Sequence, residues 1–358
     1  MEPSPSCTEH AGSVSEATAQ VQSAGGEAVV CLAGGSYPQL NLAGAHSAKV
    51  TIEPEPGSVA TIAGIALADG ASDITIHNFF VTGGVSLGAG DSLIAIDHND
   101  IDGAGPGGNG EGIETRTVNC TAPNAPVYAG CESDAPATYI TISANTIHGY
   151  GEGSTEDAIH LNNWHHVRVS ANELYNLQEH GNHTDALQSV WGGSDLVFDH
   201  NYEHDNQAQG FFIKDGDAAE VTVADNLFLR NNDLGGEENN IQVFDTAAFA
   251  MRNNTVWDGQ GDLVRAAGSS QPLGATVEHN VEQVFSVLYE GGPAYQLTED
   301  WNVFQEDPWT FSKGPHSTVL SAPEFADPAA NDYRLKSNPD HIGVDWAPAE
   351  FVYGPTGN

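Results

Sequence analysis

The side chains best suited to acid–base chemistry lie in two neighbouring stretches, NHTDALQSVWGG (182–193) and DNQAQGFFIKDG (205–216). His183 and Asp185 stand two residues apart in the first stretch, and Lys214 lies in the second. A histidine exchanges protons near neutral pH, and a lysine whose pKa is lowered can act as a base. The chain holds only four lysines, which favours a functional role for Lys214 with His183 and Asp185 beside it. The alternative is a surface ion pair between Lys214 and Asp215 or Asp185.

These stretches belong to a repeat marked by seven asparagines, each placed just after a short segment with two apolar positions. The asparagines are separated by 46, 27, 29, 25, 28 and 26 residues, and they are Asn99, Asn145, Asn172, Asn201, Asn226, Asn254 and Asn280. The apolar residues five and three places earlier alternate with polar ones, which predicts strands with one buried face. A repeat this short cannot close its own core, so it must stack. The sequence therefore predicts a parallel β-helix in which each asparagine turns inward and bonds its neighbours along the stack.

A second strand is expected after each asparagine, in the segments 112–117, 158–163, 186–191, 210–215 and 240–245. The alternation predicts an inward column of Ile113, Ile159, Leu187, Phe211 and Ile241. The first outward column is Glu114, His160, Gln188, Phe212 and Gln242, and the second is Arg116, Asn162, Val190, Lys214 and Phe244. Just ahead of the strands lie Glu111, Asp157, Asp185, Gln209 and Asn239. Stacking at about 4.8 Å per coil would bring His183, Asp185, Gln188, His204 and Lys214 into one substrate-sized patch.

The residues around this patch are the expected substrate-binding groups: His160, Gln188, Trp191, His204, Gln209, Phe212, Asp215, Gln242 and Arg116. Trp191, Phe212 and Phe244 offer flat faces on which sugar rings can stack, unless the C-terminal tail covers them. Glu111, Asp157 and Asp185 form an acidic ladder along neighbouring strands. Such oxygen-rich ladders suit calcium, for which we name Glu111 and Asp157 as ligands; the alternative is that these acids cap turns.

The chain is strongly acidic, with 49 acidic and 10 basic residues and a formal net charge of −39. This surface excludes a large nucleic-acid-binding patch. It is typical of proteins from salty habitats, where salt screens the self-repulsion, and equally of an acidic secreted protein. No stretch is long and apolar enough to span a membrane.

Cysteine usage indicates an oxidising compartment. Local pairing, Cys7 with Cys31 and Cys120 with Cys131, is the simplest of three possible connectivities. The opening MEPSPSC is not a signal peptide, so we expect a secreted protein in its mature form. We also expect a monomer.

A single domain over residues 1–358 is expected, since the repeat runs without a linker. Residues 1–30 form an N-terminal cap, with a helix over 13–22 that covers the open end of the coil. Residues 31–284 form the coils, interrupted by an insertion at 104–136 rich in Gly, Pro and Asn, and residues 285–358 form an irregular tail.

These features resemble the right-handed parallel β-helix superfamily of pectate lyases and other polysaccharide-active enzymes. The resemblance rests on VCLAGGSY as an opening strand and turn, on the asparagine-bearing coils, and on the closing segment DYRLKSNPDHIGVDW. It implies that Lys214 matches the Lys or Arg base of β-helix lyases, which use calcium held by carboxylates. NHTDALQSVWGG is similar to a polygalacturonase rung, but the paired aspartates and the Gly-His-Gly of those hydrolases are absent.

The sequence thus favours a secreted lyase that cleaves an acidic polysaccharide by β-elimination. One alternative is a glycoside hydrolase on the same fold, with Asp157 and Asp185 as acid and base at a spacing that suits retention. The further alternatives are an epimerase on this fold and a non-catalytic glycan-binding or surface protein.

Overall fold

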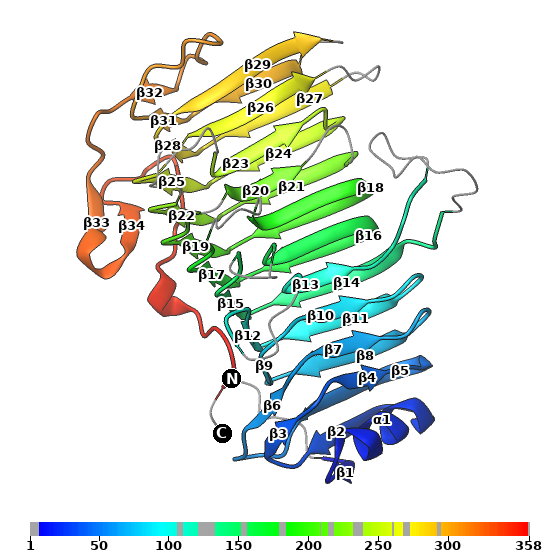
Figure 1. The fold of residues 1–358 in the computed structure, drawn as a ribbon. Helices are drawn as coiled ribbons and strands as arrows, with labels where there is room; N and C mark the ends of the chain where they lie inside the picture. Colours follow the sequence, from blue (N-terminus) through cyan, green and yellow to red (C-terminus); the bar gives the residue numbers. More distant parts are fainter. Residues whose placement is uncertain are drawn as a thin grey trace.

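The computed structural model describes residues 7–105, 110–120, 133–151, 156–178, 184–207, 209–213, 218–231, 239–259, 261–267, 273–291 and 295–356. The chain winds as a parallel β-helix, and every coil contributes strands to three faces of one elongated stack (Figure 1). The predicted fold is confirmed. No helix in this described part of the chain is long and apolar enough to cross a bilayer.

Face 1 carries the second strand predicted from the sequence. Its strands are β4 (Leu40–Leu42), β7 (Ile65–Leu67), β10 (Val85–Leu87), β13 (Ile113–Thr115), the first parts of β16 (Ile159–Ser170) and β18 (Asp185–Asp199), β20 (Gln209–Ile213), β23 (Ile241–Phe244), β26 (Asp262–Ala267) and β29 (Phe285–Gly291). The segment 262–267, which matches the sequence repeat poorly, still takes its place on this face.

Face 2 carries the strands that precede the asparagines. They are β1 (Glu9–Ala11), β2 (Ala28–Leu32), β5 (Ala45–Pro54), β8 (Ser72–His77), β11 (Ser92–Asp97), β14 (Ala137–Ser143), the second parts of β16 and β18, β21 (Glu220–Ala224), β24 (Ala248–Arg252), β27 (Leu273–Glu278) and β30 (Tyr295–Asp300).

Face 3 is a sheet that sequence reasoning missed. Its strands are β3 (Gly35–Tyr37), β6 (Ala60–Ile62), β9 (Phe80–Val81), β12 (Asp100–Asp102), β15 (Thr146–His148), β17 (Glu173–Tyr175), β19 (Tyr202–His204), β22 (Leu227–Leu229), β25 (Thr255–Trp257), β28 (Val281–Glu282), β31 (Val303–Phe304) and β32 (Thr318–Val319). Strands of two or three residues are too short to show an alternation. In most coils they begin directly after the asparagine.

The asparagines form a continuous buried ladder at the corner between faces 2 and 3, as predicted. In a typical step the backbone N–H and the side-chain Nδ2 of Asn201 both donate to Oδ1 of Asn226, at 2.8 and 3.0 Å, while Nδ2 also donates to the Val169 carbonyl at 2.9 Å. The ladder has a further member, Asn302, which accepts from Asn280. The coils therefore continue through β31, beyond the expected boundary at residue 284.

The residue before each ladder asparagine has a left-handed backbone and makes the corner itself. Examples are His98 with a φ of 54°, Ala144 with 52° and His200 with 56°. This conformation is costly for residues other than Gly and is found mainly with Asn and Asp. The satisfied amide ladder stabilises it in every coil.

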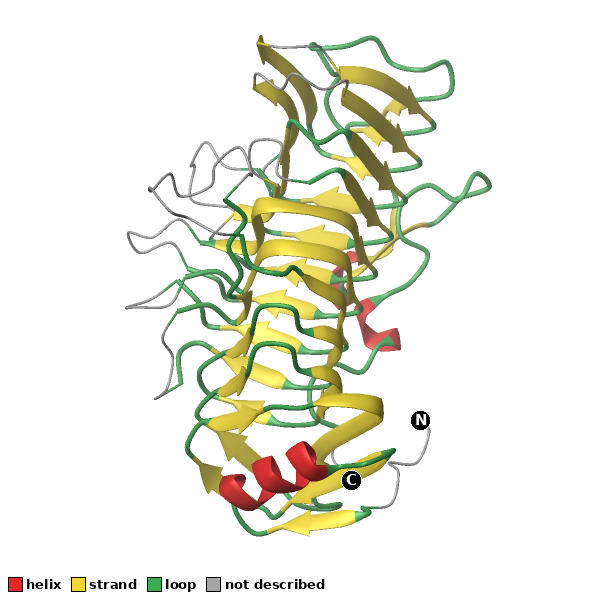
Figure 2. Cartoon of the chain, turned by 90° about the vertical axis from the view of Figure 1, so that its right-hand side faces the viewer, coloured by secondary structure: helices red, strands yellow, loops and turns green. Residues whose placement is uncertain are grey.

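A helix covers the N-terminal end of the stack. Helix α1 (Val14–Ser23) is capped by the Ser13 hydroxyl, buries Ala17 and Val21, and lies across the first coil (Figure 2). The predicted Cys7–Cys31 disulfide is present. Cys131, the predicted partner of Cys120, lies outside the described residues.

The tail returns along the outside of face 3. It contains the antiparallel pair β33 (Phe325–Asp327) and β34 (Asp332–Leu335), with the short helices η1 (Pro328–Ala330) and η2 (Pro348–Glu350). Trp346 donates to the Asp225 carbonyl, and Thr356 reaches Asn78 near the first coils, at 2.8 and 2.7 Å (Figure 1). The tail thus covers face 3.

Carboxyl groups are buried inside the coil near its C-terminal half. Glu203 of β19, Glu282 of β28 and Asp262 at the start of β26 are almost inaccessible to solvent. Burial raises the pKa of all three, to about 7 for Asp262, which interacts with Glu282. A protonated carboxyl can donate to its neighbour, so we infer that Glu282 and Asp262 share a proton in the folded state.

We predict that replacing a ladder asparagine with alanine strongly destabilises the protein. Asn201→Ala leaves the buried Asn172 N–H without a partner, at about 1–3 kcal/mol, and removes the side-chain donor to the Val169 carbonyl. Asn41→Ala, at an exposed position in β4, should change the free energy of unfolding by less than about 0.5 kcal/mol. Denaturant titration of both variants measures the difference, and equal losses would contradict the ladder's role.

The shared proton predicts a stability that falls as the pH rises. The unfolded carboxyls ionise near pH 4, whereas the folded pair keeps its proton until a higher pH, so the unfolded state binds fewer protons in between. Glu282→Gln retains a donor for Asp262 and should reduce the loss of unfolding free energy between about pH 5 and about pH 8. Glu220→Gln, at an exposed position in β21, should leave that loss unchanged. Parallel pH curves for wild type and Glu282→Gln would refute the shared proton.

Candidate functional site

The predicted outward column is present on face 1 with the predicted register. Glu114 pairs with His160, His160 with Gln188, Gln188 with Phe212, and Phe212 with Gln242 across β13, β16, β18, β20 and β23. Ile113, Ile159, Leu187, Phe211 and Ile241 are buried on the opposite side of the same strands. Five neighbouring coils therefore present one continuous line of side chains.

A local hydrogen bond recurs in this column between a residue at the start of the strand and the one three places later. Oδ2 of Asp157 contacts Nδ1 of His160 at 2.8 Å, and Oδ2 of Asp185 accepts from Nε2 of Gln188 at 2.5 Å. Asn239 and Gln242 repeat the arrangement. The sequences DAIH (157–160) and DALQ (185–188) share an aspartate three residues before the polar side chain that it bonds. The alignment of the strands placed these residues correctly, but their spacing was not recognised as a hydrogen-bonded pair.

The acids at the start of the strands also join one coil to the next. Oε2 of Glu111 accepts the Asp157 amide at 2.6 Å, and Oδ1 of Asp157 accepts the Asp185 amide at 2.7 Å. Asp157 and Asp185 are both buried. These carboxylates fix the spacing of the coils, and Asp185 also holds the Gln188 side chain.

His160 is the strongest local cation of the described column. Its Nδ1 lies 2.8 Å from Asp157 and 3.2 Å from Glu111, and its Nε2 lies 3.1 Å from Oδ1 of Asn162. Burial opposes the charged form, but the bonds to Asp157 and Glu111 raise the pKa of His160 to about 10. The side chain is 16% exposed. An imidazolium at neutral pH is therefore held at the surface of face 1.

Arg116 adds a second positive charge one coil away. Its side chain is 48% exposed, and its Nε lies 3.9 Å from Oε1 of Glu114. Burial raises the pKa of Glu114, while Arg116 lowers it. Arg116 and His160 thus place two positive charges on face 1, each beside carboxylates, in a chain whose net charge is −39.

Glu111, Asp157 and His160 place one ligand atom each within 4.8 Å of one another. The sequence named Glu111 and Asp157 as calcium ligands. Calcium takes six to eight oxygens, whereas this set offers two carboxylates already bonded to backbone amides and to a charged imidazole. The donor set does not fit calcium, and the reaction proposed below uses no metal.

Several predicted site residues lie elsewhere. His204 belongs to β19 on face 3, where it stacks on Tyr202 and Tyr175 and contacts Asp205 and Glu173. The prediction that His204 joins the patch on face 1 is wrong, because it lies on a strand of face 3 that the sequence did not reveal.

Of the three aromatic side chains expected to stack on sugar rings, only Trp191 is partly exposed. Phe212 and Phe244 are buried against each other with ring centroids 5.6 Å apart, so neither offers a free face. Gln209 is buried as well. Trp191 is partly exposed where β18 bends from face 1 to face 2, with a φ of 61°. Gln242 is partly exposed. His183, Lys214 and Asp215 lie outside the described residues, so their roles remain predictions.

The comparisons agree with this architecture. A family model described as "Right handed beta helix region" matches residues 63–256, more than half of the chain. The chain belongs to the right-handed β-helix family. No curated protein matches its sequence.

Among solved structures, a mutant of the PL6 family alginate lyase AlyGC aligns with this right-handed β-helix at a TM-score of 0.53 and 12% identity, over 98% of this chain and 58% of the lyase. The chain therefore spans less than two thirds of that protein. A mannuronic acid specific polysaccharide family 6 lyase from human gut microbiota gives a TM-score of 0.45 at 12% identity, over 87% of this chain and 82% of that one. At 12% identity the likeness to AlyGC shows the fold alone.

We predict that His160 remains protonated well above neutral pH. Its titration, followed by NMR of isotopically labelled histidine, should lie near the pKa of about 10 set by Asp157 and Glu111. Glu111→Gln keeps an acceptor for the Asp157 amide but removes one charge, and should lower the pKa by roughly one unit or more. His165, whose pKa is lowered by burial, serves as the contrast. A neutral His160 at pH 7 would contradict this electrostatic account.

Proposed function

We propose that this right-handed β-helix is a secreted, monomeric carbohydrate-active enzyme that cleaves an acidic polysaccharide by β-elimination on face 1. The observation that supports the proposal best is the cationic pair His160 and Arg116 on a chain with a net charge of −39. A polyanionic chain would be repelled by most of this surface. A local cation in a partly buried position attracts a uronate carboxylate there.

The reaction assigns a separate task to each group. A base removes the proton α to the uronate carboxylate, the electron pair forms the new C=C bond, and the bond to the β-oxygen breaks. The departing oxygen takes a proton from an acid. Lys214 is the base that the sequence favours, and we assign the acid to His183, which flanks it with Asp185. The His160 imidazolium stabilises the negative charge that develops on the carboxylate.

Gln188 positions the substrate, and Asp185 holds the Gln188 side chain in place. Asp185 is buried and holds the Gln188 amide, which faces the same side as His160 on the neighbouring coil. Two such groups about 4.8 Å apart can engage one sugar unit through hydrogen bonds. Arg116, one coil further, is placed to engage the carboxylate of the next unit.

A retaining hydrolase with Asp157 and Asp185 as its two carboxylates is not favoured. A glycosidase needs both carboxyl groups at the sugar ring, but these two are buried and bonded to backbone and side-chain donors. The alginate lyase named above shares the fold, so alginate is the first polysaccharide to test.

The expected result is ultraviolet absorbance from an unsaturated product when the protein is incubated with alginate, pectate or another polyuronate. Lys214→Ala should lower the rate by about 10²–10⁴, as loss of a proton-transfer group does, and His160→Gln by about 10²–10³. Lys49→Ala, at an exposed position on face 2, is the matched control and should keep full activity. Circular dichroism confirms that each variant is folded.

Two other outcomes would replace the proposal. New reducing ends without absorbance would assign the protein to the hydrolases. Binding without either signal, unchanged by Lys214→Ala, would assign it to glycan-binding proteins.

A further inference from the structure

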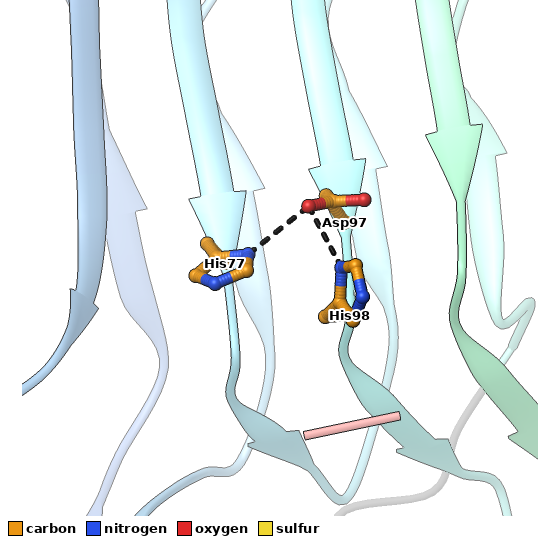
Figure 3. A group of neighbouring side chains, drawn as sticks. All are labelled: His77, Asp97 and His98. Carbon is orange, nitrogen blue, oxygen red and sulfur yellow. Dashed lines mark hydrogen bonds and ion pairs between the residues drawn. The ribbon is translucent and has the colours of Figure 1, made fainter. Parts of the chain in front are cut away.

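A second group of ionisable side chains lies outside the strands of face 1, at the corner between faces 2 and 3. His77 ends β8, and Asp97 ends β11 directly beside it in register. His98 follows Asp97 with a φ of 54°, which turns the chain at the corner. The two imidazoles and the carboxylate converge on one point between neighbouring coils (Figure 3).

The geometry of the group is that of a metal-ligand set. Nδ1 of His77 and Nδ1 of His98 lie 3.1 and 2.9 Å from the same atom, Oδ2 of Asp97. All three ligand atoms lie within 4.8 Å of one another. The three side chains are 22–29% exposed, so an ion can enter and water can complete its coordination.

A hydrogen bond from outside the group orients the carboxylate. The Ser143 hydroxyl, on the next coil, donates to Oδ1 of Asp97 at 2.7 Å. This leaves Oδ2 directed at the two histidines. Partners of this kind fix the orientation of ligating carboxylates and histidines in metal sites.

A second Asp–His pair, Asp199 and His200, lies at the same corner two coils after Ser143 and can be compared with the first. Oδ2 of Asp199 contacts Nδ1 of His200 at 2.8 Å and accepts from Nη2 of Arg168 at 2.7 Å. The residue in register with Asp199 on the preceding coil is Ser170, and Arg168, two residues earlier, supplies the second contact; a guanidinium does not ligate metals. An Asp–His pair therefore occurs at this corner without a metal-ligand set. The additional imidazole of His77 makes the Asp97–His98 pair a set of three possible ligands.

We propose that His77, Asp97 and His98 bind a divalent transition-metal ion of the Zn²⁺ type through two imidazole nitrogens and one carboxylate oxygen. Zn²⁺ prefers such a nitrogen and oxygen set at tetrahedral sites, with water in the fourth position. The ion would cross-link β8 and β11, next to the corner residue Asn78 that holds the tail through Thr356. Its role is therefore to fasten the early coils, separately from the chemistry on face 1.

The test is titration of the full, metal-free chain with Zn²⁺ and with Co²⁺, in excess Mg²⁺ to occupy the acidic surface. Calorimetry should give one Zn²⁺ per chain, Co²⁺ should give the visible absorption of a tetrahedral site, and Zn²⁺ should raise the melting temperature. His77→Gln should weaken binding by more than the roughly 10–100-fold typical of losing an outer partner.

Two further variants separate a built site from general cation uptake. His98→Asn keeps a residue suited to the left-handed corner, since Asn78 and Asn253 occupy equivalent corners, and should abolish the Co²⁺ spectrum. His200→Asn is the matched control at the other Asp–His corner and should leave Zn²⁺ binding unchanged. Absence of stoichiometric Zn²⁺ binding, or equal binding by His77→Gln and His200→Asn, would overturn the proposal.

Discussion

The amide ladder is the interaction on which the rest of the structure depends. Each ladder asparagine after Asn99 accepts two hydrogen bonds from the asparagine of the preceding coil and donates to a carbonyl inside the stack. A buried backbone donor without a partner is expensive, so the ladder fixes where every coil turns. Because the corner is fixed, the strands of all three faces keep one register over most of the chain.

This register places the candidate site. A shift of one residue in a strand would move every side chain to the opposite face, and His160 and Gln188 would then point into the core. The buried acids Asp157 and Asp185 add a second vertical connection at the start of face 1. The cation at His160 therefore follows from two ladders, one of amides and one of carboxylates, that hold the coils at a fixed spacing.

Much of this arrangement could be predicted from the sequence, because faces 1 and 2 carry clear two-residue alternation. The column from Glu114 to Gln242 has the register that its sequence indicates. The strands of face 3 are too short to give a periodic signal, so His204 could not be separated from the site. Burial of Phe212, Asp185 and Gln209 depends on neighbouring coils and loops. No local pattern reports such packing, and the Asp157–His160 pairing emerged only from the structure.

The net charge of the chain predicts that an acidic ligand is repelled, whereas the local charges on face 1 predict that it is attracted. The distance over which salt screens charges determines which effect is larger. At physiological ionic strength, charges are screened beyond about 8 Å, which is less than the height of two coils at about 4.8 Å each. A uronate on face 1 therefore senses the distant carboxylates weakly, and the charges that act on it are His160, Arg116 and the carboxylates in contact with them. At low ionic strength the screening length grows several-fold, and the charge of −39 acts as a whole. The same two cations can thus recruit a polyanion in salt and fail to do so without it.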